Sequence, residues 1–147
     1  MIRNKMTKYL KTFVAAVALM GLSFAPSFAD DAADTKATVE HHLAAFGAGD
    51  MKEMMADYTV TSVIHVPGAE FRGKAAIQQL FTGLFAEFAK PGASFNLLNM
   101  VVEGEIGYIV WNAETADNVY ELATDTFVID HGKIEVQTFA AKVTPKK

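Results

Sequence analysis

One acidic residue of the sequence lies in a setting that favours proton-transfer chemistry. Asp125 stands in the run ATDTFVI, and the two-residue period of a β-strand places it on the same face as Ala123, Phe127 and Ile129. A carboxyl group among apolar neighbours is partly desolvated, which raises its pKa and lets it remain a proton donor. The alternative is a carboxylate that pairs with a nearby helix or loop group, or that faces water.

Two histidines are the other candidate chemical groups, because the sequence contains no cysteine and therefore no thiolate nucleophile. An imidazole has an unperturbed pKa of about 6.5, so neutral His42 or His65 can accept a proton near pH 7. Each could instead be structural, His65 as a strand-end histidine bonded to a backbone carbonyl and His42 as a half-exposed helix residue. Both are far from Asp125 in sequence and no pair has metal-ligand spacing, so we predict no metal site.

Aromatic side chains could line a hydrophobic cavity around these groups, with Gln137 as a polar anchor on the same strand face as Phe139 and Ala141. Taken singly, packing in the core is the commoner role of such residues. The candidate ligand-binding aromatics are Tyr58, Phe81, Phe85, Trp111, Phe127 and Phe139.

The elements that must position these residues begin with three helices. Apolar residues at helical spacing predict a helix from Asp34 or Thr35 to Phe46, and Asp50 with Glu53 three residues later forms the capping-box pattern of a short second helix. The third helix, before Pro91-Gly92, has the clearest apolar stripe, which must face a sheet. That stripe consists of Ile77, Leu80, Phe81, Leu84, Phe85 and Phe88.

Five segments read as strands: 59–66, 95–102, 106–115, 119–129 and 134–143. The last four are joined by short turn-rich connections, which predict consecutive antiparallel hairpins. Helices followed by such a meander give an α+β arrangement in which the helices cover one face of a strongly bent antiparallel sheet. We expect the bent sheet, closed by a helix, to form a cone with an open mouth.

The first 29 residues have the organisation of a secretory signal peptide. A basic start precedes the apolar run 12–24, and small residues stand at positions −3 and −1 of a cleavage site after Ala29. A membrane anchor is the alternative, but the run is shorter than the roughly 20 residues that a spanning helix needs. We predict a periplasmic or secreted protein whose domain covers residues 30–147, without stable membrane insertion.

Cleavage would remove four of the 13 basic residues and none of the 17 acidic ones, so the formal charge would change from −4 to −8. An acidic chain without a basic stripe lacks the electrostatic footprint of a nucleic-acid-binding protein. The sequence also contains no glycine-rich nucleotide-binding motif, so we predict no nucleotide cofactor.

The run HLAAFGAGDMKEMMADYTVTSVIHVPGAEFRGKAAIQQLF, together with ATDTFVIDHGKIEVQTFAAKV, resembles SnoaL-like and ketosteroid-isomerase-like members of the NTF2-like superfamily. The resemblance covers nearly the whole predicted mature chain. It implies the NTF2-like (cystatin-like) cone with three N-terminal helices on a curved sheet. It also implies a pocket between sheet and helices, and often a homodimer.

Against the ketosteroid isomerases, the resemblance places Asp125 at their oxyanion-hole acid. It places His65 at their general base, a carboxylate before a proline in that group, and His42 at the phenol donor of the first helix. Two of three roles are thus filled by a different residue type, which argues against steroid isomerisation specifically.

Two kinds of function remain open from the sequence. The first is a cofactor-independent acid–base enzyme, an isomerase, cyclase or dehydratase that acts on a small hydrophobic molecule. The second is a non-catalytic ligand-binding or dimeric assembly domain of the periplasm. The superfamily includes both kinds, so the site must decide between them.

Overall fold

The computed structural model describes residues 28–147 of the chain, and almost all of the predicted signal peptide lies outside them. The first helix begins at Phe28, earlier than predicted, and runs through the expected cleavage point after Ala29. No helix among residues 28–147 is long and apolar enough to cross a bilayer. In chain order the elements are α1 (Phe28–Ala48), α2 (Met51–Ala56), β1 (Tyr58–Val66), β2 (Ala69–Arg72), α3 (Gly73–Phe88), β3 (Ser94–Glu103), β4 (Ile106–Glu114), β5 (Asn118–Asp130) and β6 (Lys133–Pro145).

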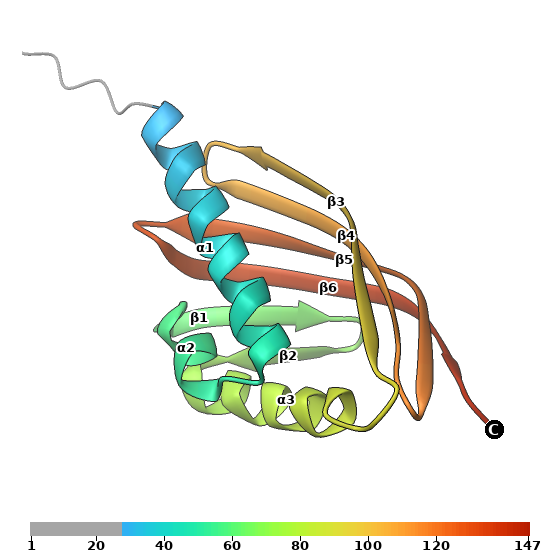
Figure 1. Ribbon diagram of the computed structural model, residues 1–147. Coiled ribbons are helices and arrows are strands. Elements are labelled where there is room, and N and C mark those ends of the chain that lie inside the picture. The colour runs from blue at the N-terminus through green and yellow to red at the C-terminus, as the bar shows by residue number, and fades with distance from the viewer. Residues whose placement is uncertain (1–27) are drawn as a thin grey trace, which may run out of the picture.

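The six strands form one curved sheet in the order β2-β1-β6-β5-β4-β3 (Figure 1). The three hairpins that join β3 to β6 are antiparallel, as predicted. Two features were not predicted: the short strand β2, and the parallel pairing of β1 with β6. Gly68, at φ 83°, makes the tight β1–β2 turn after Pro67. The α+β cone is confirmed, although its sheet is mixed at this one junction.

Helix α1 crosses the concave face of the sheet, while α3 lies beside β1 and β2 (Figure 1). Helix α1 lies close to the sheet at Gly107 of β4. A Cβ atom at this glycine would lie 2.7 Å from Cγ2 of Val39 and 3.5 Å from Cγ2 of Thr35. Because no real Cβ tolerates the first distance, the lack of a side chain at Gly107 lets α1 rest on the sheet.

Local sequence signals explain the helix ends and the packed face of α3. Asp50 caps α2, since its carboxylate accepts hydrogen bonds from the backbone N–H of Lys52 at 3.0 Å and of Glu53 at 3.1 Å. Ile77 and Phe81, two residues of the predicted stripe, are buried in the core. The rest of the stripe packs around them, and α3 thereby forms one wall of the cone.

Candidate functional site

A cavity of about 240 Å³ lies inside the cone, between the concave face of the sheet and helices α1 and α3. Its wall is mainly aliphatic and aromatic, and polar groups reach it from only a few positions. Such a composition suits a small hydrophobic molecule held by a few polar contacts. The lining residues are His42, Leu43, Phe46, Ile64, Val66, Phe71, Leu80, Phe81, Leu84, Phe88, Phe95, Ile109, Trp111, Tyr120, Asp125, Gln137 and Phe139.

Asp125 is the buried carboxyl group of this cavity, with only 6% of its surface exposed. The indole N–H of Trp111 donates to Oδ2 at 2.7 Å, and Nε2 of Gln137 donates to Oδ1 at 2.8 Å. The phenol of Tyr58 donates in turn to Oε1 of Gln137. The strand face predicted for Asp125 and the inward position predicted for Gln137 are both confirmed.

Burial sets the protonation of Asp125. It raises the pKa of the carboxyl to about 6, and the hydrogen bonds from Trp111 and Gln137 oppose part of that rise, because they favour the ionised form. The group therefore changes charge close to neutral pH, which is the range in which a general acid or base works best. Tyr58 stays a protonated donor, since burial and the charge of Asp125 raise its pKa well above the ordinary value.

His42 of α1 also lines the cavity and is 5% exposed. Its ring makes edge contacts with Tyr58, Phe81 and Phe127, at centroid distances of 6.0, 5.7 and 5.2 Å. Burial and, to a smaller extent, the positive charge of the neighbouring His41 together lower the pKa of His42 to about 3. The cavity therefore contains a neutral imidazole as well as the carboxyl group of Asp125.

The prediction that His65 faces the same cavity is wrong. Its side chain is 48% exposed and lies 3.6 Å, from Nδ1 to Oε2, from Glu70 of the neighbouring strand β2. Successive residues of a strand point to opposite faces, and it is Ile64 and Val66, on either side of His65, that line the cavity. Val66 stands directly before Pro67 and is apolar, so β1 brings no base into the pocket.

Four of the predicted ligand-binding residues line the cavity: Phe81, Trp111, Gln137 and Phe139. The other three do not. Tyr58 and Phe127 are 1% and 0% exposed and belong to the core behind the cavity wall. Phe85 borders a second recess, and Phe46 and Phe88 line both this recess and the main cavity.

Several wall residues were missed, although the signals for some of them were present. Leu80, Leu84 and Phe88 belong to the stripe of α3 that was predicted to face the sheet, and Leu43 and Phe46 continue the apolar face of α1. Phe71 comes from β2, which has only four residues and no strand signal of its own. Phe71 reaches the cavity wall because β2 pairs with β1, and the local sequence around Phe71 does not indicate this pairing.

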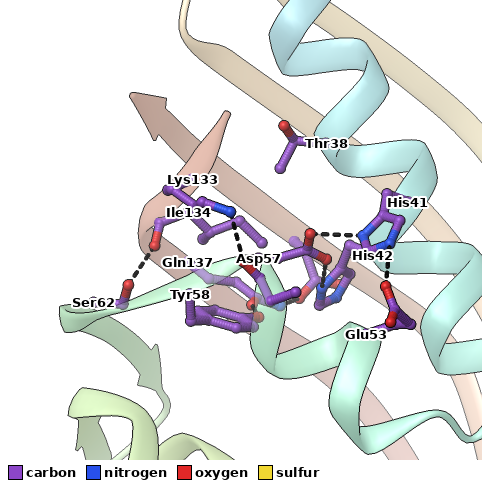
Figure 2. A network of polar contacts seen from close by, with 12 residues as sticks. Thr38, His41, His42, Glu53, Asp57, Tyr58, Ser62, Lys133, Ile134 and Gln137 are labelled. Carbon is purple, nitrogen blue, oxygen red and sulfur yellow. Dashed lines mark hydrogen bonds and ion pairs between the residues drawn. The ribbon is translucent and has the colours of Figure 1, made fainter. Parts of the chain in front are cut away.

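A polar cluster, which we call the α1–α2 cluster, adjoins the cavity through His42 and also contains His41, Glu53 and Asp57 (Figure 2). Asp57 is 5% exposed and its Oδ1 lies 2.7 Å from Nδ1 of His41. Glu53 lies 3.4 Å from the other ring nitrogen of His41. Sequence reasoning missed Asp57, which sits between a helix and a strand and has no motif around it.

Within residues 28–147, no three His, Asp or Glu side chains are grouped as ligands of a metal ion.

The SnoaL-like domain family matches residues 39–137, a span that runs from the middle of α1 into the start of β6 and contains every residue of the cavity wall except Phe139. This chain belongs to that family. No curated protein matches the chain in sequence.

Solved structures share the fold at low identity. An NTF2-like protein of unknown function from Mesorhizobium loti is 22% identical with a TM-score of 0.67, over 77% of this chain and 94% of that one. An LEH-like epoxide hydrolase from M. tuberculosis is 15% identical with a TM-score of 0.62, over 76% and 84%. A de novo designed protein with a curved β-sheet is 12% identical with a TM-score of 0.64, over 75% and 86%. Because a designed chain also adopts this shape, the fold by itself specifies no reaction.

Proposed function

We propose that this protein is an exported acid–base enzyme that moves a proton within a small hydrophobic molecule, as in an isomerisation or a cyclisation, with Asp125 as the group that carries the proton. The observation behind the proposal is the carboxyl of Asp125, which lies in an apolar cavity, is held by two neutral donors and has a pKa of about 6. The LEH-like epoxide hydrolase from M. tuberculosis is an example of an enzyme with a similar fold.

The reaction class follows from the number of titrating groups. One carboxylate can remove a proton from a carbon or oxygen of the bound molecule and return it to another atom, and the molecule then leaves with its protons unchanged in number. Such a reaction needs no nucleophile and no cofactor. Two features raise the reactivity of the carboxylate, namely its removal from water and its fixed orientation by Trp111 and Gln137.

The proposal can be tested with a chemical probe, 5-nitrobenzisoxazole, whose ring opens when a base removes its ring C–H proton and the N–O bond breaks. The product is a coloured nitrophenolate. We expect the protein to accelerate this reaction, and Asp125→Asn to lower the rate by about a hundredfold or more. His65→Ala serves as the control and should keep the wild-type rate. Equal rates for wild type and Asp125→Asn would contradict the proposal.

Ligand binding without turnover is the second candidate function. It is favoured by one observation: both oxygens of Asp125 already accept hydrogen bonds from protein side chains. Native mass spectrometry of the protein purified from its own cell envelope separates the two candidates. A bound molecule that is recovered unchanged after prolonged incubation supports binding alone.

A homodimer is part of the same proposal and is supported by large apolar side chains that are exposed on strands β3 to β6, since exposed apolar surface is a feature of interaction sites. Light scattering should give twice the molar mass of the chain for wild type and a lower mass for Leu122→Glu, in which the new carboxylate lies opposite Lys142. A monomeric wild type would contradict the dimer. The exposed residues are Leu97, Leu98, Val101, Ile106, Leu122 and Val143.

A further inference from the structure

Two complementary polar atoms of the α1–α2 cluster are buried without a partner. They are Nδ1 of His42 and Oδ2 of Asp57, which lie 4.0 Å apart and face each other across the junction of α1 and β1 (Figure 2). The separation is too long for a hydrogen bond. A buried polar atom without a partner is unfavourable by about 1–3 kcal/mol, so each of these atoms gains if the gap closes.

The protonation of the pair can be deduced from chemistry. A carboxylate oxygen only accepts hydrogen bonds, so the two atoms are complementary only when the proton of neutral His42 is on Nδ1. The opposite ring nitrogen, Nε2, then keeps its lone pair. Because His42 lines the cavity and its Nδ1 edge is turned to Asp57, Nε2 is the nitrogen available to a bound molecule.

We propose that Asp57 is a positioning residue that holds His42 in its Nδ1–H tautomer, so that Nε2 of His42 becomes a second proton-transfer group of the cavity beside Asp125. This inference rests on the proposed acid–base function and adds a second group to it. With both groups present, one can take a proton from the bound molecule while the other gives one. After the molecule leaves, the first group releases its extra proton to solvent and the second takes a proton from solvent, which restores the starting state.

The charges around Asp57 suit this role. His41 binds Oδ1 from the solvent side, Lys133 donates to the backbone carbonyl of Ala56 at 2.8 Å, and Glu53 contacts the far edge of His41. Oδ2 is thereby left for His42. When Nε2 takes a proton, the imidazolium that forms has its positive charge next to the carboxylate of Asp57, and this stabilises the charged state within an otherwise apolar wall.

The pKa values of the neighbouring residues His42 and His41 are shifted in opposite directions. Burial keeps His42 neutral when the cavity is empty, whereas the hydrogen bond and charge of Asp57 raise the pKa of His41. Burial raises the pKa of Asp57, and the hydrogen bond and charge of His41 oppose part of that rise. The contact with His41 thus favours the ionised carboxylate that His42 needs as an acceptor.

The test is a long-range proton–nitrogen correlation spectrum of the 15N-labelled protein, which distinguishes a protonated ring nitrogen from one with a lone pair. A free neutral imidazole of histidine prefers the Nε2–H tautomer, so the expected Nδ1–H form of His42 would be a reversal. Asp57→Ala should return His42 to Nε2–H as the major species. Glu53→Gln and Asp125→Asn are the controls, and both should keep the Nδ1–H form.

A wild-type spectrum with His42 in the Nε2–H form would overturn the inference, and so would an Asp57→Ala spectrum in which Nδ1–H persists. If Asp57→Ala does not fold, the wild-type spectrum still decides. His41→Gln then gives the second measurement, since it leaves Oδ2 in place and should retain Nδ1–H. None of these spectra depends on turnover, so failure here and failure of the Asp125 proposal are separate results.

Discussion

Trp111 donates its indole N–H to Oδ2 of Asp125 at 2.7 Å, and this bond joins the largest aromatic side chain of the cavity to its buried acid. The indole also stacks on Phe139 at a centroid distance of 5.9 Å. The ring is therefore held by packing while its single donor is used on the carboxylate. Trp111 thus both shapes the pocket and sets the acidity of Asp125.

Replacing Trp111 with Phe should raise the pKa of Asp125 above its value of about 6. The bond from the indole favours the ionised carboxylate, so its loss favours the protonated form, while a phenyl ring keeps much of the contact with Phe139. The carbon chemical shift of the Asp125 carboxyl, followed as a function of pH, measures the change. A pKa that stays the same or falls would show that the indole bond does not control this group.

Asp125→Asn should make the protein relatively more stable as the pH rises. The pKa of Asp125 is raised from 3.8 to about 6 on folding, so between these values the folded state binds more protons than the unfolded state and loses stability with increasing pH. The total loss through this group is roughly 3 kcal/mol, and it is complete above about pH 6. An asparagine side chain does not titrate, so in Asp125→Asn this pH-dependent loss of stability is absent.

Urea denaturation of both proteins across this pH range measures the difference. The free energy of unfolding of Asp125→Asn should increase relative to wild type between pH 3.8 and about 6, and remain constant above it. A constant difference throughout would mean that the carboxyl is not desolvated in solution.

His41→Gln should destabilise the protein most in mildly acidic solution. The pKa of His41 is raised above 6.5 by its hydrogen bond and charge interaction with Asp57, so the stabilisation is fully present below 6.5 and is lost as the pH rises through the raised pKa. The urea midpoint of His41→Gln should therefore differ from wild type below pH 6.5 and approach it in alkaline solution. The opposite trend would exclude an ion pair between these residues.

Gly107→Ala should destabilise the domain by about 1–3 kcal/mol, because the new Cβ would overlap Cγ2 of Val39 and force α1 away from the sheet. Gly83→Ala is the matched control. Gly83 lies within α3 with no atom near its Cβ position, so alanine there should stabilise the helix by about 0.5–1 kcal/mol. Thermal unfolding of the two variants should move the midpoint in opposite directions.

Export should leave a chain of 118 residues that begins with Asp30. Intact-mass measurement of the protein recovered outside the cytoplasm checks this expectation. A retained N-terminus would contradict cleavage after Ala29, and recovery of the protein only from the cytoplasm would contradict export itself.

The strands that alternate regularly could be interpreted correctly from sequence. On β5 the residues at alternate positions around Asp125, namely Ala123, Phe127 and Ile129, are apolar, and Gln137 alternates in the same way with Phe139 on β6. The inward positions of Asp125 and Gln137 were predicted from this pattern and are confirmed. β1 has no such regularity, since Ser62, Val63 and Ile64 are consecutively buried and its pairing with β6 is shifted between Tyr58 and Val63. A one-residue difference in strand register reverses the face of every side chain, which explains why His65 was assigned to the wrong side.

Asp57 and Phe71 could not be identified from local patterns for a related reason. Asp57 is buried because α1, α2 and the start of β6 meet around it, and its backbone carbonyl accepts a bond from Ile134 at 2.8 Å. Asp57 and Ile134 are 77 positions apart, and a contact between such distant residues produces no periodic pattern in the sequence. Segments with their own period were predictable, whereas sites assembled from distant segments were not.

The place of β6 within the sheet has a consequence for how the chain acquires its shape. This strand lies between β1 and β5, so the hairpin of β1 and β2 joins the rest of the sheet only when β6 is in place. Strand pairs of such large sequence separation form slowly, because the entropic cost of closing a long loop comes before the new contacts stabilise the chain. The cone therefore closes only after β6 has paired with the distant strand β1.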